Sequence, residues 1–363
     1  MAPRQAPSYA WPGHLVRPQT GQRLVYLDLN HWISLAKAAT GHATGAQYAP
    51  ALAAVRVAVA SGRYVFPLSL THYMEMVGIL DPRQRGDIAA VMEEVSGFST
   101  LLSRTAIMRL EIEAALDRVF ATTSPHIADI NLLGHGIGHA MGKRGGLYIQ
   151  SESRDVTSEV RAKWPGGLAV FDAFLADAHL QLERGVLRGP TDAEVPDLQA
   201  RGWDPTATRT IAEQRAESER QQAERLDQSP EWRNRLRDIV QARYLTLEVI
   251  NILNQALIDR DRNIDNVFTD RESGRAFTES MPSANIHVAL VEAAHRNRDK
   301  SWEPNDIFDV DGLSIAVPYC DMVVTERHAC HVIRTARIPQ GMQTEIVPRL
   351  SDLTVWLNGQ LAD

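Results

Sequence analysis

Three acidic segments, far apart in the chain, hold the residue types most able to do chemistry. Asp28 directly follows an apolar run, and Glu75 comes soon after a second run that ends at Leu68. The third segment, 306–326, carries further carboxylates around another apolar run. Carboxylate oxygens suit hard cations such as Mg²⁺ or Mn²⁺, and no Cys or His set in the sequence has the spacing of a zinc site. These segments therefore predict a divalent-cation site built from oxygen ligands.

The candidate residues are expected to meet at one edge of a sheet, because open parallel sheets bind ligands at the carboxyl ends of their strands. Clustered carboxylates repel one another unless a cation offsets their charge. Such a cation also activates water for hydrolysis of a phosphodiester. The expected catalytic residues and metal ligands are Asp28, Glu75, Asp309 and Asp321, with Glu326 as a further ligand and Asp306, Asp311 and Asn30 as alternates. Asn30 either hydrogen-bonds a metal-bound water or caps the first helix.

The elements that must position these residues follow from apolar periodicity. The N-terminal part predicts a strand, two helices, a second strand and a third helix, over 24–29, 30–39, 49–61, 63–68 and from 71 onward. Thr71 can cap the third helix, which places Glu75 in its first or second turn. This order is typical of parallel strands joined by crossover helices.

The same alternation returns near the C-terminus. A helix that opens at Asp309 or Asp311 is expected to run to about Cys320. The elements expected after it are a strand, a helix, a second strand and a closing helix, over 322–325, 326–336, 345–347 and 350–357.

The chain divides into an α/β part and a mainly helical part. Residues 1–22 are rich in Pro, Gly and polar groups and predict a flexible arm. The simplest arrangement is one discontinuous α/β domain over 23–80 and 300–363, interrupted by a helical insertion over 81–299. Helices are expected in the insertion over 83–121, 153–187, 206–227 and 229–260. The alternative is that the two halves never meet, in which case Asp28 and Asp309 are unrelated.

Composition limits the partners of the protein. The chain has 363 residues, 44% of them hydrophobic, and a formal net charge of -7. This charge gives no overall attraction to nucleic acid or to an anionic membrane, so RNA contact needs a local basic patch, such as the Arg-rich helices near 209–243, or metal ions. Only Cys320 and Cys330 are present, and neither a signal peptide nor a membrane span is evident, which favours a reducing cytoplasm.

Together the three segments resemble the PIN-like nuclease family. Asp28, with the small polar Asn30 two residues further on, matches the first acidic position of that family. Glu75 matches the second, and Asp309, ahead of the Thr325 strand, matches the third. The resemblance implies a three-layer α/β sandwich with a central parallel sheet. It also implies a Mg²⁺- or Mn²⁺-dependent endoribonuclease that leaves 5′-phosphate and 3′-hydroxyl ends.

The sequence departs from the family pattern at the fourth acidic position. The family usually has an acidic residue two positions after the Thr of the fourth strand, where this chain has Arg327. Asp321 or Glu326 would then supply the fourth carboxylate. At the third position Asp306 and Asp311 compete with Asp309. The helical insertion has no counterpart in the minimal family.

A glycine-rich loop over 134–146 is the other segment with chemical potential. Its glycines disfavour a helix, so we expect a flexible basic loop. Its backbone amides, with Lys143 and Arg144, are candidates for contact with a phosphate backbone, and a plain mobile loop is the alternative. His31 and His72, which lie close to the acidic positions, are expected to be structural.

Three functions are left open by the sequence. The first is a metal-dependent endoribonuclease acting on RNA such as tRNA or mRNA, and family analogy extends this to a toxin or defence effector held by an inhibitory or regulatory protein partner. The second is a catalytically inactive PIN-like scaffold that acts as an interaction protein. The third is a magnesium-dependent DNase or another phosphoesterase.

Overall fold

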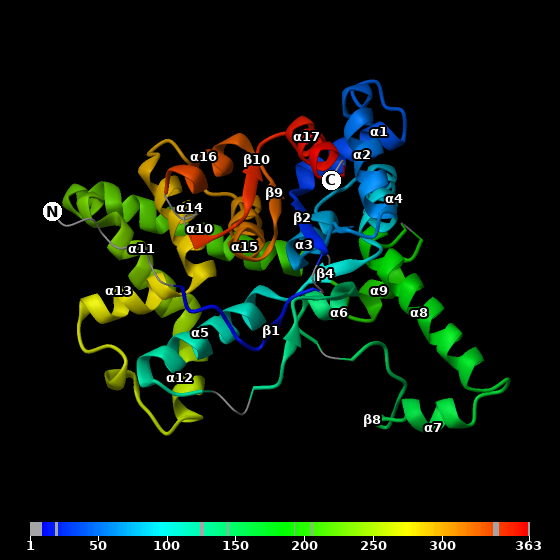
Figure 1. Cartoon of the computed structure of the whole chain (residues 1–363), viewed down its shortest axis with the longest axis horizontal. Coiled ribbons are helices and arrows are strands. Elements are labelled where there is room, and N and C mark those ends of the chain that lie inside the picture. The colour runs from blue at the N-terminus through cyan, green and yellow to red at the C-terminus, as the bar shows by residue number, and fades with distance from the viewer. Residues whose placement is uncertain are drawn as a thin grey trace.

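Helices make up most of the structure, and a small parallel sheet lies among them (Figure 1). The computed structural model describes residues 9–18, 21–123, 127–143, 145–191, 193–204, 206–336 and 341–361. The α-helices are α1 (Leu29–Ala39), α2 (Ala49–Ala60), α3 (Leu70–Val77), α4 (Pro82–Ser96), α5 (Arg104–Phe120), α6 (Gly136–Ala140), α7 (Thr157–Ala162), α8 (Leu168–Arg188), α9 (Val195–Ala200), α10 (Ala207–Gln228), α11 (Leu236–Tyr244), α12 (Ile250–Ile258), α13 (Arg271–Ser280), α14 (Pro282–Arg296), α15 (Pro304–Tyr319), α16 (Arg327–Thr335) and α17 (Leu350–Leu361). In the described parts of the chain, no helix is both long and apolar enough to cross a membrane.

The strands are short, and several single-turn helical segments join the longer elements. The strands are β1 (Leu15–Val16), β2 (Arg23–Leu27), β3 (Tyr64–Val65), β4 (Ser99–Leu101), β5 (Ile130–Asn131), β6 (Leu133–His135), β7 (Gln150–Ser151), β8 (Arg154–Asp155), β9 (Met322–Val324) and β10 (Glu345–Val347). The 3-10 segments are η1 (Ala46–Tyr48), η2 (Pro230–Arg235) and η4 (Ile264–Asn266), and η3 (Leu245–Val249) is a π-helical turn.

The central sheet joins the two ends of the chain. Within the described residues it has four strands in the order β10-β9-β2-β3, all parallel. Val25 pairs with Met322 and Leu27 with Val324, so β2 lies beside β9. The predicted α/β class with parallel strands is confirmed, and the alternative that the two halves never meet is excluded.

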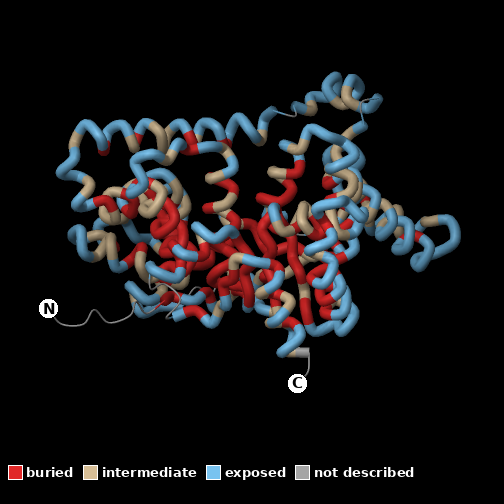
Figure 2. The backbone as a smooth tube through the Cα atoms, turned by 90° about the horizontal axis from the view of Figure 1, so that it is seen from above, coloured by how far each residue is buried: buried red, intermediate tan, exposed pale blue. Residues whose placement is uncertain are grey.

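Helices cover both faces of this sheet. Because successive side chains of a strand point to opposite faces, neighbouring residues of β2 enter different cores. Val25 and Leu27 pack with side chains of α1, α2, α4 and α17, whereas Leu24 and Tyr26 pack with side chains of α5, α14 and α15. Figure 2 shows the buried residues gathered in the middle of the molecule.

The expected insertion over 81–299 does not pack as a separate unit. α4 begins just inside it, yet packs on α1 and contributes Ile88 to the same core as β2. β4 lies beside the segment that follows β3, where Leu68 N–H donates to Ser99 O at 2.8 Å. At the other boundary, α14 packs along α15. An amphipathic helix must bury its apolar stripe, and these helices bury theirs against the sheet domain.

Part of the expected N-terminal arm is packed rather than flexible. Tyr9 and Leu15 are buried, Ala10 N–H donates to Ser280 O at 2.8 Å, and β1 pairs in parallel with β5. The expectation of a flexible arm is wrong for 9–18, because its apolar side chains find a core. The stretches 1–8 and 19–20 of that expected arm lie outside the described residues.

Several helix boundaries differ from the sequence expectation, and the helix expected over 153–187 is divided into β8, α7 and α8. The helix predicted over 83–121 is two helices, because Gly97 adopts a left-handed φ of 53° that ends α4 and leads into β4. α15 begins at Pro304 rather than at Asp309 or Asp311, since Glu303 caps it. The earlier start places Asp309 in the second turn of α15.

Glu111 on α5 is a buried carboxylate that holds three helices together. Its oxygens accept hydrogen bonds from Ser283 N–H at 3.0 Å and from Tyr319 O–H at 2.6 Å. Burial raises the pKa of Glu111 to about 7, although these hydrogen bonds lower it. A helix of the insertion is thereby fastened to the start of α14 and to the end of α15.

Glu111 should make the protein less stable as the pH rises from 4.5, its ordinary pKa, to about 7. In this window the folded protein holds a proton that the unfolded chain has released, so the stabilisation is present below the window and lost toward its upper end. Glu111→Gln keeps an acceptor oxygen but cannot titrate. The unfolding free energy of the wild type relative to this variant, from urea titrations, should fall across the window. A difference that does not change with pH would contradict the assignment.

Candidate functional site

Asp28 stands at the carboxyl end of β2, where the chain turns directly into α1. Its N–H donates to Val324 O at 3.0 Å, and Thr325 Oγ1 donates to Asp28 Oδ2 at 3.2 Å. Both side chains of this second pair are buried. The hydroxyl therefore orients the carboxylate. Thr325 was not among the sequence candidates, although its place directly after an apolar strand mirrors that of Asp28.

Glu326 and Asn30 lie on the solvent side of this sheet edge. Glu326 directly precedes α16, and Asn30 lies in the first turn of α1. Asn30 Nδ2 donates to Glu326 Oε1 at 2.6 Å, and both residues are exposed. The cap position of α1 belongs to Asp28, so Asn30 is a partner of a candidate carboxylate rather than a helix cap.

Glu75 and Asp309 approach from α3 and α15, two helices that pack together. Each lies in the second turn of its helix and is half-buried. α3 begins two residues earlier than expected, because Ser69 rather than Thr71 caps it. This start keeps Glu75 within the range of turns that the sequence indicated.

The charges of these carboxyl groups act on one another's pKa values. Burial raises the pKa of Asp309 to about 8, and the charges of Asp28 and Glu326 act in the same direction. Burial also raises the pKa of Asp28 to about 6, with Glu326 as the next cause. The pKa of Glu75 lies well above its ordinary value, through burial and then through Asp309 and Asp28. We call these four residues the carboxylate cluster.

The donor chemistry of the carboxylate cluster fits a hard divalent cation. Its acidic groups offer only oxygen atoms, which Mg²⁺ and Mn²⁺ prefer, and a cation would offset the repulsion among them. As the side chains stand in the described residues, no three His, Cys, Asp or Glu form a group that could hold a metal ion. To bind one, the carboxylates must therefore turn toward a common point.

His72 joins the two elements that carry Asp28 and Glu75. Ser69 N–H donates to His72 Nδ1 at 2.9 Å, and His72 Nε2 lies 2.8 Å from Leu27 O. A backbone N–H can only donate, so Nδ1 accepts and Nε2 carries the proton that is donated to the carbonyl. Burial lowers the pKa of His72 to about 4, which maintains this neutral form. The histidine has the structural role expected of it.

The structure separates Asp321 from the carboxylate cluster. Asp321 precedes β9, and Leu24 N–H near the start of β2 donates to its Oδ2 at 2.7 Å. Asp28 follows the other end of β2, about 13 Å away at the usual rise of a strand. The expectation that Asp321 is a catalytic residue and metal ligand of this site is therefore wrong, because parallel pairing puts Asp321 at the amino edge of the sheet. Glu326 is instead the fourth member of the carboxylate cluster.

Asp306 is engaged at the start of α15. Glu303 N–H donates to Asp306 Oδ2 at 2.8 Å, and Lys300 Nζ lies 2.6 Å from Asp306 Oδ1. Its charge contributes to the raised pKa of Asp309 after burial and the other carboxylates. Asp306 therefore borders the cluster, with its own oxygens already bonded.

Asp311 belongs to a closed ring of four charged side chains, which we call the charge ring. Arg104 on α5 lies 3.4 Å from Asp311 and 2.9 Å from Glu248 on η3. Arg215 on α10 lies 2.5 Å and 3.2 Å from the same two carboxylates. Burial acts to raise the pKa of Asp311, but the two arginines outweigh it and lower the value to about 2. The expectation that Asp311 is an alternate metal ligand is therefore wrong, because its carboxylate forms ion pairs with the two arginines.

The glycine-rich loop is ordered where the structure describes it. β6 and α6 occupy 133–140, so the expectation of a flexible loop without a helix is wrong there. Glu183, a buried carboxylate on α8, accepts the Ile137 N–H at 2.9 Å and so caps α6 despite its glycines. Lys143 is exposed just beyond α6, with no ion pair to the carboxylate cluster in the described chain. Arg144 lies outside the described residues.

The arginine-rich helices near 209–243 bind carboxylates of the protein itself. Examples of these ion pairs are Arg220–Glu217, Arg233–Asp227, Arg237–Glu292 and Arg243–Glu219. Arginines paired in this way offer less positive potential to a phosphate backbone. The expectation of a basic RNA-binding face there is not supported.

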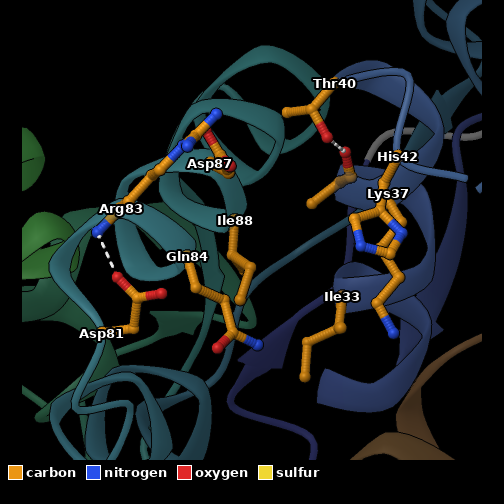
Figure 3. Close-up of a pocket in the computed structure, with 10 residues that line it drawn as sticks. Ile33, Lys37, Thr40, His42, Asp81, Arg83, Gln84, Asp87 and Ile88 are labelled. Carbon is orange, nitrogen blue, oxygen red and sulfur yellow. Dashed lines mark hydrogen bonds between the residues drawn. The ribbon is translucent and has the colours of Figure 1, made fainter.

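A groove of about 540 Å³ lies between α1 and α4 (Figure 3). Lys37 and Arg83 line it together with Asp81 and Asp87, so their charges balance. Figure 3 shows the hydrogen bond that the backbone N–H of Arg83 donates to the Asp81 carboxylate. Its length is 2.9 Å. Its lining residues include none of the carboxylate cluster, so we treat it as a separate feature.

Comparison with known proteins adds no relative. Neither protein-family models nor curated proteins nor solved structures match the chain. The function of the site must therefore be inferred from its own geometry and chemistry.

Removal of one charge from the carboxylate cluster should lower the pKa values of its neighbours. Asp28 raises the pKa of both Glu75 and Asp309, so both values should fall in Asp28→Asn. Carboxyl-carbon NMR titration of protein labelled at Asp and Glu measures this. Asp321→Asn is the matched control and should leave both values unchanged. Equal shifts in the two variants would rule out the cluster as described.

Opening of the charge ring should destabilise the fold strongly. Asp311→Asn leaves Arg104 and Arg215 to share one carboxylate, which should lower the unfolding free energy by about 3 kcal/mol in urea titrations. Glu217→Gln removes a partner of Arg220 from an exposed ion pair and should lower it by less than about 1 kcal/mol. Similar losses in both variants would mean that the ring does not persist in solution.

Proposed function

We propose that the protein is a metal-dependent endoribonuclease with a PIN-like core, a three-layer α/β sandwich extended by the helices of 81–299. The observation that carries this proposal is the carboxylate cluster at the carboxyl edge of a parallel sheet. Its four acids come from three separate segments of the chain, and three of the acids have raised pKa values. Clustered acids oppose folding, so such an arrangement favours a functional role, and perturbed pKa values gather at functional sites.

Each residue of the cluster has a distinct place in the proposed site. Asp28 is the central ligand, because Thr325 orients it. Glu75 and Asp309 would supply ligands from the two packed helices, and Glu326 from the solvent side. When bound there, Mg²⁺ or Mn²⁺ supplies charge neutralisation for a phosphate oxygen and activation of water for phosphodiester hydrolysis.

The proposed substrate is RNA, which is what the family resemblance implies. The chain carries a net charge of -7, so the cations at the cluster must supply much of the attraction for a phosphate. The exposed pair of Asn30 and Glu326 marks the open side of the site. A toxin or defence effector of this kind would be held by a regulatory protein partner that covers this open side.

A second candidate function is that of a non-enzymatic interaction protein on the same scaffold. Two observations favour it. No ready metal-binding group is present among the described residues, and Arg327 stands where the resemblance leads one to expect an acid. In this version the helices of 81–299 form the working surface and the cluster binds no cation.

Cleavage of total cellular RNA in Mg²⁺ or Mn²⁺ tests the proposal. The wild type should cleave and leave 5′-phosphate ends, and a chelator should stop it. Asp28→Asn and Glu75→Gln should each lower the rate by roughly 100-fold or more, because each removes a charge that positions the cation. Asp321→Asn is the control and should retain wild-type activity.

Each other result of this experiment has its own meaning. Equal cleavage by the wild type and both cluster variants would reject the site. Faster cleavage of DNA than of RNA would change the substrate class. If nothing is cleaved and calorimetry detects no Mn²⁺ binding, the non-enzymatic function is the better one.

A further inference from the structure

A cavity of about 570 Å³ lies where the helices of 81–299 meet α3 and α15. Its walls come from α3, α5, α10, η3, α14 and α15, so neither part of the chain builds it alone. The apolar part of the lining includes Leu70, Met74, Ile211, Leu247 and Val291. Both the volume and the mixture of apolar walls with a few polar groups are typical of small-molecule sites.

The charged part of the lining consists of the charge ring, with two positive and two negative side chains, and of Glu219, which is paired with Arg243 at 2.8 Å. His287 adds a neutral group. Arg104 Nη2 lies 3.4 Å from His287 Nδ1, and because an arginine only donates, Nδ1 is the acceptor. The cavity therefore holds donors and acceptors, and each of its charged side chains is offset by an ion pair. An inorganic anion or a metal ion gains little there, whereas an uncharged ring with donors and acceptors on its edge is complementary.

The backbone next to the cavity has an uncommon form. η3 is a π-helical turn, a geometry that is rare and often found at functional sites. Two of its residues, Leu247 and Glu248, line the cavity, the first as an apolar wall and the second as a member of the charge ring. This distortion is a second observation, independent of the volume and charge, that points to a ligand.

The cavity borders the carboxylate cluster along two helices. On α3, Met74 lines the cavity and the next residue, Glu75, belongs to the cluster. On α15, Val310 lines the cavity and the preceding residue, Asp309, belongs to the cluster. Neighbouring Cα atoms are about 3.8 Å apart, so α3 and α15 each carry a cluster residue and a cavity residue within one turn.

We propose that this cavity binds a nucleobase of the RNA strand cleaved at the carboxylate cluster, so that the helices of 81–299 select the cleavage sequence. The inference rests on the proposed ribonuclease function and adds the element that determines its specificity. A base has a flat apolar face for Leu247 and Ile211, and an edge of donors and acceptors for the charge ring. Gln214 and Ser218 add neutral hydrogen-bonding groups to the lining.

Nucleoside binding tests the cavity without any need for catalysis. The probes are adenosine, guanosine, cytidine and uridine, titrated calorimetrically into full-length Asp28→Asn without metal. One nucleoside should bind at least about tenfold more tightly than the weakest. Ile211→Trp, added to this variant, should weaken that binding about tenfold or more, because it fills the mouth of the cavity. Ile258→Trp is the matched control, since Ile258 is also exposed, 68% against 57%, and does not line the cavity.

Mapping of the cleaved ends tests the link to the substrate. The wild type should prefer one base near the cut, and Ile211→Trp should lose this preference while it still cleaves RNA. Leu247→Trp, a second exposed position of the lining, should act in the same way.

The outcomes separate this inference from the proposed function. RNA cleavage with unchanged preference in both lining variants, and no nucleoside binding, would overturn the inference and leave the ribonuclease intact. Nucleoside binding that both lining variants weaken, without any cleavage of RNA by the wild type, would support the base site and reject the ribonuclease. Nucleoside binding that neither lining variant weakens would overturn the location of the site.

Discussion

The backbone pairing of β2 with β9 is the interaction on which the rest of the structure depends. It places Asp28 beside Thr325 although the two lie near opposite ends of the chain. Since side chains alternate along a strand, a shift of one residue in this register would exchange the residues that enter the two cores. The same register therefore determines both how the helices pack and which acids meet.

The carboxylate cluster is held together against its own repulsion. His72 fastens the end of β2 to the start of α3, and the Thr325 hydroxyl bonds the carboxylate of Asp28. Burial and the charges of its neighbours raise the pKa of Asp309, which favours its protonated form and lowers the charge of the cluster. Burial makes the charged forms of these carboxyl groups unfavourable. The same burial would strengthen the attraction between the carboxylates and a bound cation.

The helices of 81–299 are part of the same body as the sheet. Glu111 bonds Tyr319, the charge ring joins α5, α10 and η3 to α15, and the apolar side chains of both parts form continuous cores. A segment fastened by buried carboxylates and ion pairs cannot move away at low cost, because each broken pair would leave a buried charge. The fastened elements α5, α10, η3 and α14 therefore form a wall beside α3 and α15, and such rigidity is what a site that selects one base would require.

The amino-acid sequence by itself determined the main strands, most of the helices and the candidacy of Asp28, Glu75 and Asp309, because apolar periodicity and capping signals are local properties. Only the tertiary structure decided that Asp321 lies at the wrong end of the sheet and that Asp311 binds arginines. Both outcomes depend on strand register and on partners distant in the chain, which no local pattern encodes. The glycine-rich loop became ordered for the same reason, since a buried carboxylate from α8 supplies the helix cap that its own residues lack.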